Sequence, residues 1–308
     1  MAILFFGTPQ FAVPSLQALM QEKEDIVLVV TQPDKAKGRG HILSSPPVKS
    51  LAESRGIRVI QPSRIRNEDF YRELRAARPE FIVVVAYGKI LPGEVLAVPE
   101  KGCVNVHASL LPKYRGAAPI QWALINGERT TGVTTMLMDA GMDTGDVLLQ
   151  SELEIRDEDN AGTLSLRLSE LGAKTLIETL RGIRAGSVRP VPQRGGASSA
   201  PPLKKSDGKV DWNRSAEEIS DFVRGMSPWP SAFGYLNKEM IKIIRAKPLE
   251  GTGVPGRVEK ASDGELVVGT RKGLLRIEEL QPEGKKAMPA AAFIAGRRLA
   301  GKSSQGFS

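Results

Sequence analysis

Short apolar runs alternate with amphipathic stretches along the first 190 residues. Phe81–Ala86 is an almost unbroken Ile/Val run, which is typical of a strand covered on both faces of a parallel sheet. Helical spacing of apolar residues extends over Phe11–Met20 and over the long stretch Ala161–Gly186. The other predicted strands are Ala2–Phe6, Ile26–Thr31, Lys101–His107 and Gly132–Met138. Strands that alternate with helices predict an α/β fold with a doubly wound sheet.

The pattern changes after residue 187. Residues 187–208 are rich in Pro, Gly and Ser without an apolar period, which predicts a linker or an extended surface arm. Beyond it, Ser215 and Glu218 have the spacing of a capping box that begins a short helix. The strand-like runs Met240–Ile244, Glu265–Val268 and Leu274–Leu280 then predict a small β-rich domain, such as a barrel. We expect a first domain over 1–189, a linker over 190–208, a second domain over 209–302 and a tail over 303–308, disordered from Lys302.

Composition restricts the class of protein. The longest apolar run, Phe81–Tyr87, is far shorter than the roughly 20 residues that a bilayer span needs. The first residues lack a basic leader and a cleavage site, so they predict a buried strand and not a signal peptide. The single cysteine, Cys103, excludes an internal disulfide framework and fits a reducing cytosol. With two histidines and one cysteine, a His/Cys zinc finger and a three-histidine zinc site are excluded.

The positive charge is unevenly distributed. The whole chain has a formal net charge of +8. Residues 200–308 hold 19 Lys and Arg against 13 Asp and Glu, a net +6, which leaves +2 for residues 1–199. This bias indicates either an acidic partner for the last third of the chain or a solvated basic surface.

The predicted strand Cys103-Val-Asn105-Val-His107 has the most informative side chains. Because strand side chains alternate, Cys103, Asn105 and His107 are expected to share one face. Polar residues at the carboxyl end of a buried strand are costly unless they are hydrogen-bonded or functional. In open α/β sheets that end is where ligands bind. A hydrogen-bonded core Asn and His is the alternative.

Two loops and one turn add to this picture. Residues 108–119 form a Pro/Gly-punctuated loop directly after His107, and residues 139–146 form a Gly- and Asp-rich loop at the carboxyl end of another predicted strand. The first turn, Gly7-Thr-Pro9, does not match G-x-G-x-x-G, and no phosphate-binding P-loop is present. The sheet is therefore expected to be Rossmann-like, with little support for hydride transfer.

Acyl transfer to an amine is a chemistry that uses Asn, His and Asp without a protein nucleophile or a metal. The amine is its own nucleophile, the Asn can donate a hydrogen bond to a developing oxyanion, and the His can donate another or move a proton. Ser109 is a rival nucleophile, but it lacks a Gly-x-Ser-x-Gly elbow. Cys103 is a second rival, for which packing in the core is the simpler interpretation.

These residues resemble the 10-formyltetrahydrofolate-dependent formyltransferases. The motifs are Asn-Val-His-Ala-Ser-Leu-Leu-Pro from Asn105 and Met-Asp-Ala-Gly-Met-Asp-Thr-Gly from Met138. Further similar motifs lie at Phe6–Ala12, Thr31–Asp34, Arg115–Gln121 and Ser227–Pro230, so the resemblance covers roughly residues 2–300. It implies that Asn105, His107 and Asp143 are the catalytic residues.

The motifs over the whole chain are similar to the branch of the family that acts on methionyl-tRNA. The implied reaction moves a formyl group from 10-formyltetrahydrofolate to the methionine amine of initiator methionyl-tRNA, for translation initiation. The second domain would be an OB-like barrel, and the protein a cytoplasmic monomer without a membrane or a metal. The folate-binding residues that the resemblance implies are Ser109, Leu110, Leu111, Pro112, Tyr87, Gly88, Ile90, Leu91 and Asp139.

Contacts with the tRNA are implied for two basic regions. The resemblance gives the Asp34–Val48 insertion, with Arg39, a role at the acceptor end, although its composition alone is that of a solvated loop. In the second domain the residues are chosen by charge. The implied tRNA-binding set is Lys35, Lys37, Arg39, Lys242, Arg245, Arg271 and Lys272.

Two alternatives remain at this point. One is a folate-dependent formyltransferase for a small amine, such as an amino-sugar nucleotide or glycinamide ribonucleotide, which would give no reason for a basic second domain. The other is an RNA-binding protein whose α/β domain only supports the barrel, which would leave Asn105, His107 and Asp143 without a role.

Overall fold

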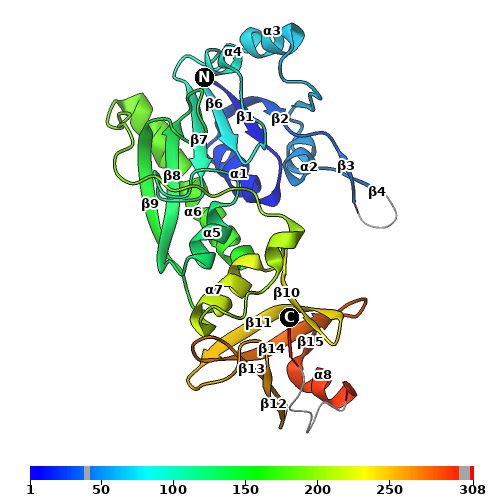
Figure 1. The fold of residues 1–308 in the computed structure, drawn as a ribbon. Helices are drawn as coiled ribbons and strands as arrows, with labels where there is room; N and C mark the ends of the chain where they lie inside the picture. Colours follow the sequence, from blue (N-terminus) through cyan, green and yellow to red (C-terminus); the bar gives the residue numbers. More distant parts are fainter. Residues whose placement is uncertain (38–41, 298–305) are drawn as a thin grey trace. The chain divides into compact units, whose positions relative to one another are not determined.

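The computed structural model describes residues 1–37, 42–297 and 306–308 (Figure 1). These residues form two compact units. The first unit comprises residues 1–119, 130–154 and 165–201, and the second comprises residues 120–129, 155–164 and 202–308. Residues 190–201 of the expected linker therefore group with the first unit.

The first unit is built on a seven-stranded sheet in the order β5-β2-β1-β6-β7-β8-β9. Neighbouring strands from β5 to β7 are parallel, whereas β8 is antiparallel to both β7 and β9. The strands are β1 (Ala2–Gly7), β2 (Asp25–Val30), β5 (Val59–Ile60), β6 (Phe81–Val85), β7 (Cys103–His107), β8 (Thr130–Leu137) and β9 (Val147–Glu154). The predicted Rossmann-like α/β fold is confirmed, with an antiparallel extension at one edge. The nine residues between β8 and β9 are too few for a parallel crossover, so these strands form a hairpin.

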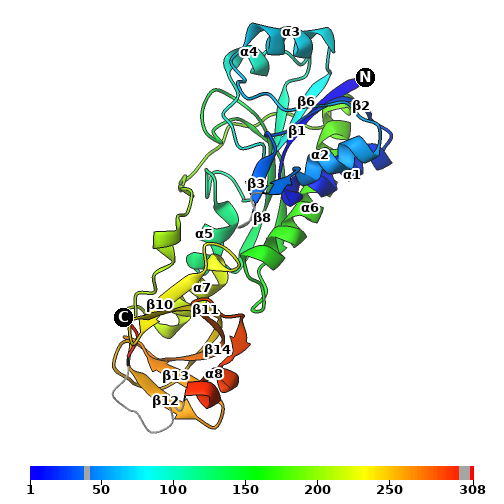
Figure 2. The same cartoon turned by 90° about the vertical axis from the view of Figure 1, so that its right-hand side faces the viewer.

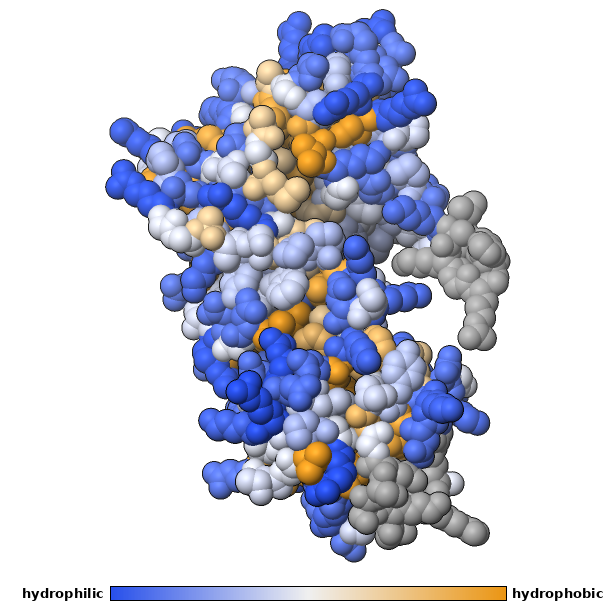
Figure 3. All heavy atoms as spheres, in the orientation of Figure 1, coloured by the Kyte–Doolittle hydropathy of each residue, from blue (hydrophilic) through white to orange (hydrophobic). Residues whose placement is uncertain are grey.

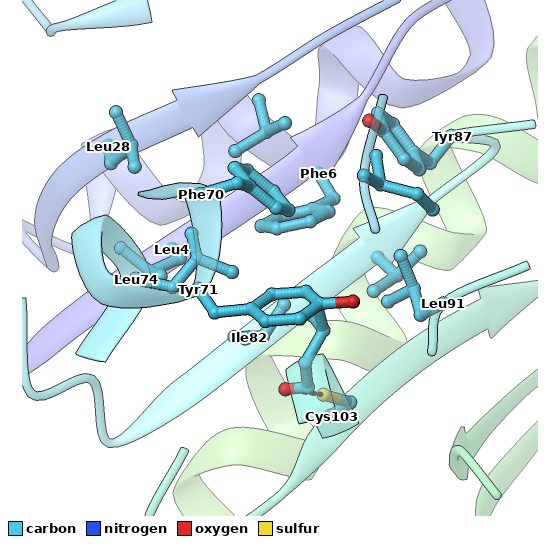
Figure 4. Packing of buried hydrophobic residues seen from close by; sticks show 14 residues of the cluster. Leu4, Phe6, Leu28, Phe70, Tyr71, Leu74, Ile82, Tyr87, Leu91 and Cys103 are labelled. Carbon is cyan, nitrogen blue, oxygen red and sulfur yellow. Dashed lines mark hydrogen bonds between the residues drawn. The ribbon is translucent and has the colours of Figure 1, made fainter. Parts of the chain in front are cut away.

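Helices cover both faces of this sheet. On one face the buried cluster of Figure 4 joins alternate residues of β1, β2 and β6 to α3 and α4. On the other face α6 lies so close that a side chain at Gly172 would meet Val106 of β7. Figure 2 shows α1 and α6 beside one another. The helices are η1 (Gln10–Ala12), α1 (Val13–Gln21), α2 (Pro47–Ser54), α3 (Glu68–Ala76), α4 (Gly93–Leu96) and α6 (Ala161–Ala185).

Two short strands of the Asp34–Val48 insertion pair with one another as a small hairpin. Strands β3 (Lys35–Lys37) and β4 (Ile42–Ser44) pair in antiparallel register as a sheet of their own. At its base, Nζ of Lys49 donates to Asp34 Oδ2 at 2.9 Å and to Gln61 Oε1 at 2.8 Å. These polar contacts fix the base of the hairpin to the first unit.

The second unit contains an antiparallel sheet in the order β10-β11-β14-β13-β12, and β15 pairs with β14. This confirms the predicted β-rich domain. Its strands are β10 (Ala232–Leu236), β11 (Glu239–Leu249), β12 (Val258–Ser262), β13 (Glu265–Gly269), β14 (Leu274–Pro282) and β15 (Met288–Pro289). Its helices are α5 (Pro119–Ile125), η2 (Lys205–Gly208), α7 (Ala216–Met226) and α8 (Ala290–Arg297). The predicted capping box is confirmed, because Ser215 Oγ accepts from Glu218 N–H and the Glu218 carboxylate accepts from Ser215 N–H.

The sheet of the second unit is made barrel-like by residues 306–308. Phe307 bridges to Leu236 at the end of β10, and Gly306 bridges to Arg257 just before β12. Phe307 is buried, with its ring 5.4 Å from that of Trp212. The expectation of disorder from Lys302 is therefore wrong for Gly306–Ser308, because the aromatic side chain and the strand pairing fix these residues.

Polar residues dominate the face of the molecule shown in Figure 3, with apolar residues in scattered groups. None of the helices within the described ranges is long and apolar enough to cross a bilayer.

Candidate active site

Strand β7 places its side chains as the alternation predicts. Cys103 and Asn105 lie opposite Ile82 and Val84 of β6, and neighbouring strand partners share a face. Cys103 is buried in the cluster that α3 and α4 cover (Figure 4), whereas Asn105 is half-buried nearer the carboxyl end of β7. His107, the last residue of the strand, is 6% exposed. Asn105 and His107 therefore lie at the carboxyl end of β7, the end of a strand at which open α/β sheets bind ligands.

The ring of His107 has two different neighbours. Nε2 is 3.0 Å from the backbone oxygen of Tyr114, and Nδ1 is 3.6 Å from Oδ2 of Asp143. Because a carbonyl oxygen only accepts, Nε2 must carry a hydrogen and donate it. Nδ1 is therefore the ring atom that can gain or lose a proton, and it faces the carboxylate.

Asp143 is held by the backbone of the loop after β7. Its Oδ2 accepts a hydrogen bond from the N–H of Gly116 at 2.8 Å, and its side chain is 17% exposed. Asp143 has φ +53°, a left-handed conformation that a tight turn imposes. The carboxylate is thus fixed beside His107 by a turn and by one backbone donor.

The antiparallel course of β8 determines how Asp143 reaches His107. Because β8 is antiparallel to β7, Leu137 at its carboxyl end pairs with Val104 near the start of β7, whereas Thr134 pairs with His107. The loop after β8 therefore starts near the amino end of β7, and Asp143 reaches His107 because the loop folds back. The loop follows the carboxyl end of its strand as expected, but this end lies at the opposite edge of the sheet from the carboxyl end of β7.

The side-chain amide of Asn105 has no hydrogen-bond partner among the residues that the structure describes. A half-buried amide costs free energy when its donors and acceptor stay unpaired. Residues two apart on one strand lie about 7 Å apart, so this amide is near His107. Asn105 is thus a free hydrogen-bond donor close to the His107–Asp143 pair.

The two rival nucleophiles have other roles. The hydroxyl of Ser109 is buried and donates to the Lys113 carbonyl at 2.6 Å. Burial raises the pKa of the Cys103 thiol to about 12, so the thiol stays protonated at neutral pH. Neither residue has the environment of an activated nucleophile.

The predicted folate residues occupy three loops of the first unit. Ser109–Pro112 follow β7, and Thr134 of β8 holds them by accepting from Leu111 N–H at 3.0 Å and donating to the Ser109 carbonyl at 2.7 Å. The second loop contains Asp139, which is exposed and accepts from Thr144 at 2.7 Å.

The third loop follows β6 and is fixed by the first turn of the chain. The carbonyl of Tyr87 accepts from Thr8 Oγ1 at 3.3 Å and from Gln32 Nε2 at 3.1 Å. The Tyr87 ring is buried edge-to-face on Phe6 (Figure 4), and burial raises the pKa of its hydroxyl to about 12. Leu91 is also buried, whereas Gly88 and Ile90 are exposed.

Two exposed apolar side chains make these loops suitable for a flat aromatic ligand. Ile90 is 66% exposed and Met142 is 58% exposed, each in a loop of the predicted folate set or directly beside one. Large apolar side chains at loop tips gain free energy when a ring system covers them.

A solvent-open cavity of about 520 Å³ lies elsewhere in the first unit. Arg66, Asn67, Glu68, Tyr71, Pro92, Gly93 and Glu94 line it. None of the three catalytic candidates lines this cavity, and we assign it no role in the chemistry.

The basic candidates in the first unit are only partly described. Lys35 is exposed at the start of β3. Lys37 ends β3, and its side chain lies outside the description; Arg39 lies outside the described residues altogether. The structure therefore supports an exposed position for Lys35 alone.

In the second unit the candidates occupy two places. Lys242 is half-buried and Arg245 is exposed on β11, and the Arg245 guanidinium pairs with Glu278 at 2.9 Å. Arg271 and Lys272 are exposed side by side in the turn between β13 and β14. Arg271 and Lys272 are thus two neighbouring exposed cations of the predicted tRNA-binding set.

Several residues that hold the site were not predicted. Tyr114 and Gly116 lie in a loop that the sequence did indicate, but their roles depend on backbone groups, which no side-chain pattern reveals. Thr134 looks like an ordinary strand residue. Gln193 lies in the arm rich in Pro, Gly and Ser, where no pattern of residues indicates a contact with Asp143 or Arg115.

Comparison with known proteins identifies the family of both parts of the chain. Residues 1–180 match the family described as Formyl transferase, and residues 202–298 match Formyl transferase, C-terminal domain. A methionyl-tRNA formyltransferase of Thermodesulfovibrio yellowstonii is 57% identical over 297 residues, covering 96% of each chain. One of Pelobacter propionicus is 50% identical over 300 residues, covering 97% of this chain and 94% of the relative.

A solved structure shows the same fold at low identity. The N-formyltransferase of Helicobacter canadensis, in complex with folinic acid and dTDP-3-aminofucose, superposes with a TM-score of 0.71 at 20% identity, covering 91% of this chain and 98% of that one. The two family matches cover residues 1–180 and 202–298, and the relatives extend over almost the whole sequence. The resemblance noted from the motifs is confirmed, and the chain belongs to the formyl transferase family.

Proposed function

We propose that this protein transfers the formyl group of 10-formyltetrahydrofolate to the amine of methionine on initiator methionyl-tRNA, for translation initiation. The observation that carries the chemistry is the Asn105–His107–Asp143 arrangement, a free amide donor beside an imidazole that faces a carboxylate. The substrate is supported by relatives of 50 and 57% identity, both named for methionyl-tRNA, over nearly their full lengths.

Asn105 stabilises the charge that develops during transfer. The folate supplies the formyl group, whose carbon exchanges its bond to a folate nitrogen for a bond to the methionine amine. As the amine attacks, negative charge develops on the formyl oxygen. The Asn105 amide, unpaired among the described residues, can donate to that oxygen without first breaking another hydrogen bond.

His107 moves the proton. The attacking amine loses one proton, and the departing folate nitrogen gains one. Nε2 of His107 is committed to the Tyr114 carbonyl, so Nδ1 is the atom that takes the proton. Asp143, 3.6 Å from Nδ1, stabilises the ring while it is positively charged.

We further propose that the three loops of the predicted folate set bind the donor. The exposed Ile90 and Met142 would pack on the pterin ring, and Asp139 is available to accept hydrogen bonds from it. The loop Ser109–Pro112, which Thr134 fixes, would lie beside the reactive end of the donor. Among the described residues no group of His, Cys, Asp and Glu is arranged to hold a metal ion.

The basic residues are proposed to bind the tRNA phosphates. Lys35 with Lys37 and Arg39 of the insertion would contact the acceptor end, and the second domain would extend the surface through Lys242, Arg245, Arg271 and Lys272. Such contacts weaken as salt rises. We also propose that the protein acts as a monomer in the cytoplasm; sedimentation of the protein at assay concentration tests the first of these.

Formylation of a small amine is the rival activity, because the Helicobacter canadensis structure with an amino-sugar nucleotide has the same fold. The decisive experiment offers purified protein 10-formyltetrahydrofolate with charged initiator methionyl-tRNA, uncharged tRNA, or dTDP-3-aminofucose. We expect formyl-methionine on the charged tRNA and no product with the sugar nucleotide. Formylation of the sugar nucleotide without formylation of methionyl-tRNA would overturn the proposal.

A further inference from the structure

One residue of the exposed arm between α6 and the second unit turns toward the active site. Every residue from 189 to 199 is exposed except Gln193. The arm is tied down on both sides of it. Val191 exchanges two backbone hydrogen bonds with Val147, at 2.8 and 2.9 Å, and Ala200 exchanges two with Arg115 and Ala118, at 2.7 and 3.1 Å. Gln193 is thus held at a defined place between two anchor points.

The amide of Gln193 joins two parts of the site. Its Nε2 donates to the backbone oxygens of Asp143 at 2.9 Å and Gly145 at 2.8 Å. Its Oε1 accepts from Nε of Arg115 at 3.1 Å and from the guanidinium nitrogen Nη2 at 2.7 Å. Carbonyls only accept and a guanidinium only donates, so the amide can lie in one orientation only.

Gln193 and Gly116 hold different parts of Asp143. The main chain of the Asp143 turn is held by Gln193, and its carboxylate is held by the N–H of Gly116. The same carboxylate faces Nδ1 of His107. Shifting the turn would move the carboxylate away from the imidazole, and displacements of about 1 Å in a reacting arrangement can cost about 10²-fold in rate.

We propose that Gln193 is a positioning residue for formyl transfer, which fixes the Asp143 turn against His107 and sets the direction of Arg115. This rests on the proposed function. Among the described residues, the Gln193 amide contacts the backbone oxygens of Asp143 and Gly145 and the guanidinium of Arg115, so it acts on the site through these groups.

Glutamate at this position separates the two contacts. Gln193→Glu keeps an oxygen for Arg115 but replaces the donor to Asp143 and Gly145 by an acceptor. Gln193→Met keeps the length and removes both contacts. Ser199→Ala is the matched control, since Ser199 lies on the same arm and its exposed side chain makes no hydrogen bond among the described residues.

The test measures kcat, both KM values, and hydrogen exchange at the Gly116 amide in the full-length protein. We expect Gln193→Glu and Gln193→Met to lower kcat by about 10- to 100-fold, with KM for folate and for methionyl-tRNA within about threefold of wild type. Exchange at the Gly116 amide should speed up, because its acceptor has moved. Ser199→Ala should leave all four quantities unchanged.

The outcomes distinguish this inference from the proposed function. If wild type formylates methionyl-tRNA and Gln193→Glu retains its kcat, the inference is wrong while the function stands. Lower kcat with unchanged exchange at Gly116 would also contradict it, because the loss would then not pass through Asp143. A wild-type protein inactive on methionyl-tRNA would instead reject the function, and the exchange measurement would still test whether Gln193 holds the turn.

Discussion

The backbone N–H of Gly116 donates to Oδ2 of Asp143 over 2.8 Å, from a position where no side chain fits. Gly116 has φ +126°, and a Cβ there would lie 2.6 Å from the carbonyl oxygen of Ala200. The residue that holds the acidic member of the site must therefore be glycine, because both its conformation and its contact with the arm exclude a side chain.

Replacing Gly116 by alanine should consequently damage stability and catalysis together. A non-glycine residue in this conformation costs about 1–3 kcal/mol, before the clash with Ala200 is added. We expect Gly116→Ala to lower the midpoint of urea unfolding and to reduce kcat by about 10²-fold, through displacement of Asp143. Gly196→Ala is the control, since a Cβ there meets nothing within 4 Å. A stable, fully active Gly116→Ala protein would contradict the geometry of this loop.

Asn105 is expected to matter for turnover and little for stability. Asn105→Ala removes the proposed donor to the formyl oxygen, and the loss of one such donor costs about 10²–10³ in rate. Folate binding, measured by titration calorimetry, should stay near wild type, because the donor acts on charge that develops during transfer. Wild-type turnover in Asn105→Ala would remove Asn105 from the mechanism.

His107 can be tested atom by atom. In His107→Gln the side-chain nitrogen can replace Nε2 as donor to the Tyr114 carbonyl, but nothing replaces Nδ1. His107→Ala loses both. We expect both variants to lose at least about 10²-fold in kcat, and His107→Gln to be the more stable of the two in thermal unfolding. Substantial activity in His107→Gln would show that Nδ1 does not take the proton.

The thiol of Cys103 should be chemically inert in the folded protein. Burial raises its pKa from 9.0 to about 12, so the folded state keeps the proton that the unfolded chain releases above pH 9. The contribution of the protonated thiol to the free energy of unfolding is fully present below pH 9 and is lost as pH rises toward 12. A thiol reagent at pH 8 should label wild type only after denaturant is added. Rapid labelling of the native protein would show that the thiol is not inert. Between pH 9 and pH 11 the unfolding free energy should fall more steeply for wild type than for Cys103→Ala, and equal slopes would contradict the raised pKa.

The turn between β13 and β14 should affect tRNA and leave folate alone. Arg271→Ala with Lys272→Ala is expected to raise KM for methionyl-tRNA and to reduce the slope of log affinity against log salt by about 1 to 2, because two phosphate contacts are lost. Lys285→Ala with Lys286→Ala removes the same charge from another exposed turn and serves as the control. Equal effects of the two double variants would mean that only net charge matters.

Much of this architecture could be predicted because its signals are local in sequence. The Ile/Val run at Phe81–Ala86 became β6, and the alternation around Asn105 placed Cys103 in the core and His107 at the edge of the sheet. Ser215 and Glu218 capped α7 as their spacing required. In each case the side chains themselves carry the information.

The supporting contacts of the site could not be predicted in this way. The antiparallel course of β8 depends on the shortness of the next connection, and it changes the route by which Asp143 reaches His107. The contacts of Gly116 and Gln193 are made by or to backbone groups, between segments separated by 27 and by 50 residues. Hydrophobic periodicity predicts which side chains are buried, but it does not predict hydrogen bonds to backbone groups of distant segments.

The exposed arm also determines how short a working catalytic fragment can be. The family match for the first domain ends at residue 180 and includes Asn105, His107 and Asp143. Gln193, Ser198 and Ala200, which hold the loops around those residues, all lie beyond it. A protein truncated at residue 180 would keep Asn105, His107 and Asp143 but lose these contacts. We therefore expect that a fragment built for enzymology or inhibitor screening has to extend through Pro201.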